Sequence, residues 1–139
     1  MKKRKVTVCL MIISVLMVSV LFMGASCSST TANVSNAVMT TGIDDNYAPI
    51  DNVTEFAVNT DVYVAADLKN APDDTNITFI WYYEGQQLAT KTISNGEVSD
   101  APLAGYLPAD FMSQPGNYSV EIYIDDRDKP DTVNQYTVK

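Results

Sequence analysis

Hydrophobic residues follow two different patterns along the 139 residues of this chain. The first is an unbroken apolar run over residues 6–23, with basic residues at 2–5 before it and small residues at 24–26 after it. This order of positive, apolar and small residues is typical of an export signal. The second pattern begins at Thr60, where apolar and polar residues alternate with a period of two, which predicts β-strands. We therefore expect an N-terminal targeting segment followed by a β domain.

The alternating part of the chain predicts strands separated by turns rich in Pro, Gly, Asn and Asp. The predicted strands cover residues 61–68, 76–83, 88–93, 118–124 and 133–138. A first edge strand is expected at 38–41, and a short helix near 108–111. Strands at this spacing, with no long amphipathic helix, predict an all-β fold, an antiparallel sandwich of about seven strands. We divide the chain into a signal sequence or anchor helix over 1–26, a flexible tether over 27–36 and one sandwich over 37–139.

The small residues after the apolar run end at Cys27. Gly24-Ala25-Ser26-Cys27 resembles a bacterial lipoprotein signal, although Gly24 stands where that family usually has Leu. The resemblance implies that Cys27 is lipidated and becomes the mature N-terminus. The other cysteine, Cys9, lies inside the apolar run, so the exported chain holds no disulfide partner for Cys27. The alternatives are plain secretion and an uncleaved helical anchor, since the run of 18 residues, interrupted only by Thr7, Ser14 and Ser19, is just long enough to span a bilayer.

Composition narrows the classes of function. All 17 acidic residues but only five basic residues lie beyond Cys27, which gives the exported part a net charge of −12. Such a charge argues against nucleic acid and anionic lipid head groups as partners. The sequence contains no histidine, which excludes His-based catalytic triads and the commonest metal ligand. Paired carboxylates, as in glycosidases, stay an alternative, but a domain this small has little room for a deep cleft, so we expect no enzymatic activity and no cofactor.

Two passages narrow the predicted sandwich further. Trp81-Tyr82-Tyr83-Glu84-Gly85 is similar to the passage from strand C to strand C′ of immunoglobulin-like (Ig-like) domains. Gln114-Pro115-Gly116-Asn117-Tyr118 resembles the turn into strand F, which carries a tyrosine corner in that family. Where the family usually has an acidic residue and a cysteine, this chain has Gln114 and Val120, and the strand B cysteine is also missing. The resemblance is therefore to disulfide-free bacterial Ig-like domains, covers residues 54–139, and implies a core containing Trp81, Tyr118 and Val120.

The alternation also predicts a candidate binding surface. If Trp81 and Val120 point inward, then Ile80, Tyr82 and Tyr123 point outward from neighbouring strands. Tyrosine suits recognition surfaces, because it offers a large area and a hydroxyl group at low entropic cost. This surface would bind a protein or a polymer. The alternatives are ordinary cross-strand pairing, or coverage by the segment before Asn59.

Acidic side chains of two loops form a second candidate site. An Ig-like strand order places both loops at one end of the sandwich, where their carboxylates could supply the oxygens that calcium prefers. The alternative is that aspartate serves there as a turn residue, with Arg127 and Lys129 neutralising part of the charge. The residues concerned are Asp73, Asp74, Asp125, Asp126, Asp128 and Asp131.

The sequence thus predicts an exported protein of the cell envelope, held at a membrane by an N-terminal lipid. Its expected role is to display a non-catalytic binding or docking module. The main alternative is an accessory structural subunit of an envelope complex with no ligand of its own, and a calcium-stabilised surface adhesion module is a further one.

Overall fold

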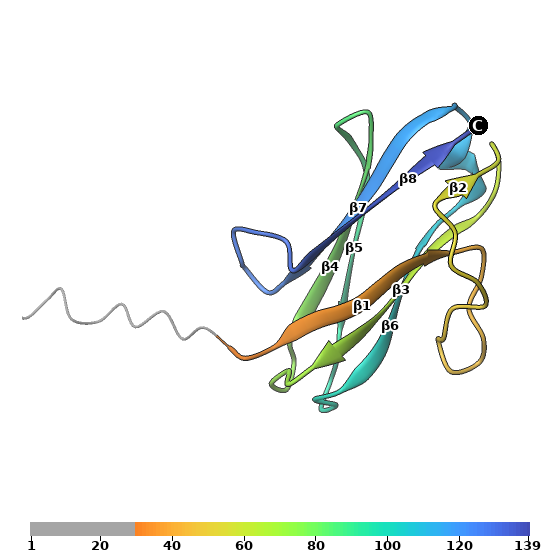
Figure 1. The fold of residues 1–139 in the computed structure, drawn as a ribbon. Helices are drawn as coiled ribbons and strands as arrows, with labels where there is room; N and C mark the ends of the chain where they lie inside the picture. The colour runs from red at the N-terminus through yellow and green to blue at the C-terminus, as the bar shows by residue number, and fades with distance from the viewer. Residues whose placement is uncertain (1–29) are drawn as a thin grey trace, which may run out of the picture.

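The computed structural model describes residues 30–139, which form two β-sheets packed face to face (Figure 1). The predicted signal segment and Cys27 lie outside these residues. The all-β sandwich is confirmed, with eight strands and a short 3-10 helix in the described part of the chain. The elements are β1 Asn33–Thr40, β2 Glu55–Phe56, β3 Val62–Lys69, β4 Asn76–Tyr83, β5 Gln86–Ser94, β6 Ala101–Leu107, η1 Ala109–Met112, β7 Gly116–Ile124 and β8 Thr132–Val138.

The two sheets differ in size, and the chain passes between them several times. The smaller sheet has the order β1-β3-β6, and the larger sheet has the order β2-β8-β7-β4-β5. Neighbouring strands are antiparallel, except that the two-residue strand β2 runs parallel to β8. The N-terminal segment therefore contributes an edge strand to each sheet, and none of its strands lies across the outer face of β4 and β7.

The core lies between the sheets and follows the predicted alternation. Every second side chain of β3, β4 and β7 is buried, as a strand with one face on the core requires. Trp81 and Phe79 are the largest fully buried side chains of the described residues. The large apolar side chains that are fully buried are Val62, Val64, Leu68, Ile77, Phe79, Trp81, Leu107, Met112, Val120, Ile122 and Ile124.

The first strand begins earlier than the sequence predicts. β1 starts at Asn33, inside the range 27–36 expected to be a tether, and Val34 is buried in the core. A β-bulge between Ser35 and Val38, with Asn36 at a φ of 53°, interrupts the alternation. Because the bulge shifts the side chains by one position, the segment does not look like a strand in the sequence.

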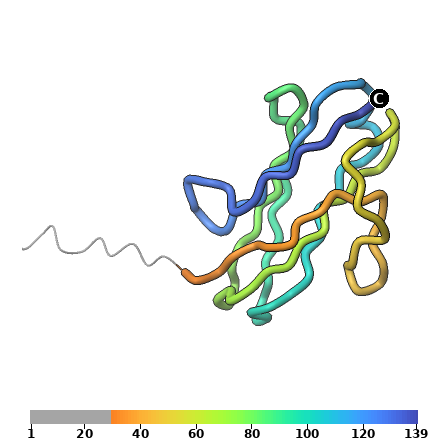
Figure 2. The backbone as a smooth tube through the Cα atoms, viewed as in Figure 1, coloured from red at the N-terminus to blue at the C-terminus, as the bar shows by residue number. Residues whose placement is uncertain are grey.

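A side-chain clamp holds the start of the described chain. The Arg127 guanidinium pairs with Asp131 and donates to the carbonyl oxygens of Thr30 and Ala32, at 3.1 and 2.7 Å. The other carboxylate oxygen of Asp131 accepts from the backbone N–H of Val34 at 2.6 Å. Residue 30 therefore lies beside the β7–β8 loop, whereas the C-terminus lies at the opposite end of the sandwich (Figure 2).

Two further features concern the passage between β5 and β7. β6 contains Pro102, which cannot donate to a strand ladder, and it lies at the free edge of the smaller sheet where that loss is tolerated. The short helix expected near 108–111 is η1. Within residues 30–139, no helix is both long and apolar enough to cross a membrane.

Candidate functional site

The predicted core residues meet in the centre of the larger sheet. Trp81 on β4 is directly opposite Val120 on β7, and both are buried. Tyr118 lies two residues before Val120 on β7, on the same face, and its hydroxyl donates to the carbonyl oxygen of Gln114 at 2.9 Å. A tyrosine corner makes this bond to the backbone a few residues upstream. Burial raises the pKa of Tyr118, because the charged phenolate would lose its hydration.

Tyr136 on β8 connects the predicted core residues, although it is not one of them. Its ring stacks on Tyr118, with the ring centres 5.5 Å apart, and meets the edge of Trp81 at 6.3 Å. Burial raises the pKa of Tyr136 far above its ordinary value. The alternation of β8 is misleading, because the apolar Val133 lies on the exposed face while Tyr136 and Val138 face the core.

The predicted outward residues lie together on the outer face of the larger sheet. Ile80 is opposite Glu121, Tyr82 is opposite Ser119, and Tyr123 is opposite Thr78. Residues opposite one another in an antiparallel pair lie on the same face, so the two tyrosines flank the pair of Ile80 and Glu121. All three predicted residues are half-buried by their neighbours.

Glu121 connects the two tyrosines electrostatically. The hydroxyl of Tyr123 donates to its carboxylate at 2.6 Å, which raises the pKa of Tyr123 to about 12. Desolvation and the same carboxylate raise the pKa of Tyr82. Both phenols therefore stay protonated at neutral pH and can donate or accept hydrogen bonds with an uncharged partner.

The outer face of the larger sheet carries almost no charge. Of the fifteen outward residues on β4, β5, β7 and β8, only Glu121 carries a charge at neutral pH. The remaining residues are Thr, Asn, Gln, Ser, Tyr, Ile and Val. They are Asn76, Thr78, Ile80, Tyr82, Gln87, Thr90, Thr92, Ser94, Asn117, Ser119, Tyr123, Val133, Gln135 and Thr137.

An open groove of about 570 Å³ extends this face at the end where β4 turns into β5. Ser119 and Gln135 line it and lie in the same row as Tyr82, so the groove is continuous with the aromatic part of the face. Glu84 on its rim accepts a hydrogen bond from the backbone N–H of Asn117 at 2.7 Å. This bond connects the β4–β5 turn to the start of β7. The groove is lined mainly by amide and hydroxyl groups, and its two aromatic lining residues, Tyr118 and Tyr136, are almost fully buried.

The acidic loops lie at one end of the sandwich, and two of their carboxylates make hydrogen bonds that hold the fold. Asp125 accepts from the backbone N–H of Asn76 at 2.8 Å, and Asp131 is occupied by Arg127 and Val34. Within residues 30–139, no three carboxylate, thiol or imidazole groups come together in a way that could hold a metal ion. The residues of the predicted calcium site, Asp73, Asp74, Asp125, Asp126, Asp128 and Asp131, are thus not gathered into such a group in the described part of the chain.

Comparisons with known proteins show a likeness of fold. No family model and no curated protein sequence matches the chain. The alkylpurine DNA glycosylase AlkC of Pseudomonas fluorescens, solved with DNA containing an abasic site analogue, is similar over 81% of this chain and 31% of its own length. The TM-score is 0.53 at 8% identity. The C-terminal domain of Wzt is similar over 80% of this chain and 75% of its own length, with a TM-score of 0.54 at 13% identity.

The chain thus spans less than a third of the glycosylase that it resembles, as the 31% coverage states. Two proteins with unrelated descriptions share its sandwich, and at these identities the likeness concerns the fold alone. The described part of the chain is an all-β sandwich of two sheets, and its function has to be argued from its surfaces.

Proposed function

We propose that this protein is a lipid-anchored component of the cell envelope whose Ig-like domain docks a partner through the outer face of the larger sheet. The observation that carries the proposal is the lack of charge on that face in a chain whose exported part has a net charge of −12. Depletion of charged residues and enrichment of tyrosine are the compositional features of interface cores. No catalytic step is part of the proposal.

The Ig-like assignment rests on strand order and on two side chains. Taking β1, β3 and β6 as strands A, B and E, and β4, β5, β7 and β8 as strands C, C′, F and G, gives the two sheets of such domains. A buried tryptophan on strand C and a tyrosine corner before strand F support the same assignment.

The free edges of the sheets favour docking through a face. On the edge strand β5, Lys91 is paired with buried Phe79 and so lies on the inner side of the sheet. The same strand has a bulge near Leu88. On β6, Pro102 interrupts one edge of the smaller sheet. Inward-pointing charges, bulges and prolines are devices that prevent strand addition. A partner would therefore contact the side chains of the outer face.

Replacing Tyr82 and Tyr123 together by serine is expected to abolish partner binding. Truncating two central aromatic anchors of an interface costs on the order of 2 kcal/mol or more each. The measurement is cross-linking in intact cells followed by capture of the protein. The matched control is Tyr106→Ser, because Tyr106 is 48% exposed and its hydroxyl is 3.2 Å from a carboxylate of Asp61, but it lies on the smaller sheet.

The outcome also separates the two remaining roles. One partner in fixed proportion would identify a structural subunit of an envelope complex, and several partners would identify a docking module. Unchanged capture by a double variant that melts at the original temperature would show that the face serves only the fold.

Replacing Cys27 by alanine is expected to release the protein from the membrane fraction. Without the acylated cysteine, the acidic exported part has no attraction to an anionic surface, because its net charge is −12. The measurements are membrane fractionation and electrophoretic mobility, with Cys9→Ala as the matched control inside the apolar run. A Cys27→Ala protein that stays in the membrane at its original mobility would contradict lipidation and support an uncleaved anchor.

A further inference from the structure

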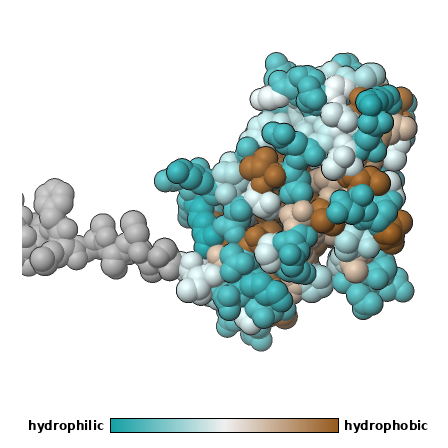
Figure 3. Space-filling model, viewed as in Figure 1, coloured by the Kyte–Doolittle hydropathy of each residue, from teal (hydrophilic) through white to brown (hydrophobic). Residues whose placement is uncertain are grey.

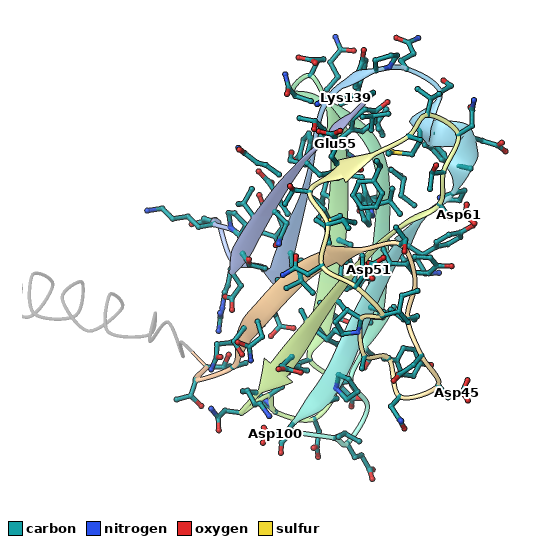
Figure 4. The ribbon with its side chains drawn as sticks, turned by 45° about the vertical axis from the view of Figure 1, so that its right-hand side comes forward. Asp45, Asp51, Glu55, Asp61, Asp100 and Lys139 are labelled. Carbon is teal, nitrogen blue, oxygen red and sulfur yellow. The ribbon has the colours of Figure 1, made fainter. Side chains whose placement is uncertain are left out.

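A second surface lies on the opposite side of the sandwich, around the loop of residues 41–52. This loop follows β1 and stands beside the smaller sheet, with Asp45 at its tip (Figure 4). Ile50 and Tyr47 are 63% and 55% exposed, the largest values among the large apolar side chains of the described residues. Figure 3 shows brown, hydrophobic surface interrupting the teal surface where the end of β1 and the following segment run. We name Tyr47 and Ile50 the loop anchors.

The loop is held in one conformation by its own hydrogen bonds. Asp51 accepts from the hydroxyls of Thr40 and Thr41 and from the backbone N–H of Thr41, which lowers its pKa. Asp44 accepts from the backbone N–H groups of residues 46 and 48, at 2.8 and 2.9 Å. Because the loop is already ordered, its anchors would lose little conformational entropy on binding.

Tyr47 has a backbone conformation that bulky residues rarely adopt. Its φ is 62°, in the left-handed region that favours glycine. Such a conformation costs on the order of 1 kcal/mol or more and persists only where the surrounding structure holds it. Here the loop holds in it a tyrosine that is 55% exposed and that lines the groove beside the loop.

A groove of about 240 Å³ separates the loop from the outer face of the smaller sheet. Its floor is formed by small or compact apolar residues, namely Val38, Ala65 and Pro102, and its wall by Ala48 and Pro49 of the loop. A groove of this size accepts one large aliphatic or aromatic side chain. The surface therefore both presents apolar anchors and offers an apolar recess beside them.

The charge around this surface is mainly negative, with Lys69, two residues after Asp67 on the same face of β3, as the exception. Residues 28–68 contain six acidic residues and no Lys or Arg. Asp67 lines the groove itself, and Asp44 and Asp45 belong to the loop. A negative field of this kind attracts and orients basic partners, with a strength that falls as salt is added. It contrasts with the outer face of the larger sheet, which is almost uncharged.

We propose that the loop anchors and the groove behind them form a second docking site, which binds a protein segment carrying a large apolar side chain between Lys or Arg residues. The apolar side chain fills the groove, while the basic residues pair with the surrounding aspartates. The loop anchors cover the bound segment from the outside. This site does not depend on the function proposed for the larger sheet.

The probe for this site is a phage-displayed library of random linear peptides, selected on the full chain in mild detergent. We expect enrichment of peptides with a central Leu, Ile, Phe or Trp flanked by Lys or Arg. The selected peptide should bind the variant carrying both Tyr47→Ser and Ile50→Ser more weakly by about tenfold or more, as the loss of about 1.4 kcal/mol implies. The variant carrying both Tyr82→Ser and Tyr123→Ser should bind it unchanged, which keeps the two proposals distinguishable.

A pair of charge reversals tests the electrostatic part. Asp45→Lys, at the loop tip, should weaken peptide binding at low salt and make it less sensitive to added salt. Asp126→Lys changes the charge equally in the β7–β8 loop, at the other end of the sandwich, and should have little effect. Selection of the same peptides by the Tyr47→Ser, Ile50→Ser variant, or selection of peptides without basic residues, would overturn the proposal, provided that this variant and the unmodified chain melt at the same temperature.

Discussion

Replacing Trp81 by alanine is expected to lower the free energy of unfolding by about 3–5 kcal/mol, the range for large aromatic residues in cores. Trp81 is 1% exposed and lies between Val120 and Ala89 on the neighbouring strands. Its ring also meets the edge of Tyr136, so alanine would leave a cavity in the centre of the aromatic cluster. Since small domains have a total stability of roughly 5–15 kcal/mol, part of the population would unfold.

The measurement is denaturant unfolding of the full chain, with two comparisons. Trp81→Phe should lose less, because it keeps a ring and removes an indole N–H that finds no acceptor among the described residues. Ile80→Ala changes the next residue of β4, on the outer face, and should have a much smaller effect. Equal losses for Trp81→Ala and Ile80→Ala would mean that the two faces of β4 are not inside and outside.

The strands that the sequence predicts best are those with an uninterrupted period of two. β4 and β7 were expected at residues 76–83 and 118–124 and lie at Asn76–Tyr83 and Gly116–Ile124. Both are central strands whose inner side chains are all apolar, so burial of one face determines their register. The alternation of inward and outward side chains along β4 and β7 was sufficient to place Ile80, Tyr82 and Tyr123 on one face.

The parts that could not be predicted depend on contacts distant in the chain. The start of β1 is concealed by a bulge and stabilised by Arg127, 97 residues away from Thr30. β6 contains a proline, which reduces its resemblance to a strand, and only its position at an edge makes that proline acceptable. The two residues of β2 are too few to produce a pattern.

The candidate sites, too, depend on which residues the fold brings together and not on local sequence pattern alone. Charge depletion on the larger sheet was not visible in the sequence, because the outward residues of four strands have to be brought together first. The aspartates of the β3–β4 and β7–β8 loops were expected to converge, but Asp125 accepts from the backbone of Asn76, and Asp131 binds Arg127 and the backbone of Val34. The loop anchors carried no periodic signal at all, since residues 41–52 form a loop whose shape is determined by hydrogen bonds to Asp44 and Asp51.

Replacing Gly105 by alanine is expected to destabilise the protein by about 1–3 kcal/mol, the usual cost of overpacking a core. A Cβ atom at this position of β6 would lie 2.6 Å from Cδ1 of Phe79 and 2.9 Å from Cγ1 of Val64. Phe79 and Val64 are buried on facing sheets, so neither can move away without disturbing its neighbours. Gly105 therefore sets how closely β6 approaches the larger sheet.

A double-mutant cycle tests whether the contact with Phe79 is the cause. Phe79→Leu removes the ring edge that a methyl group at 105 would meet, so the double variant should lose less than the sum of the two single losses. The expected coupling free energy is on the order of 1 kcal/mol. The matched control is Gly42→Ala, because its Cβ would meet only the exposed side chain of Ile50, at 3.0 Å, which can rotate away. Strict additivity in the cycle would assign the loss at Gly105 to the backbone, and the two sheets would then be spaced by other contacts.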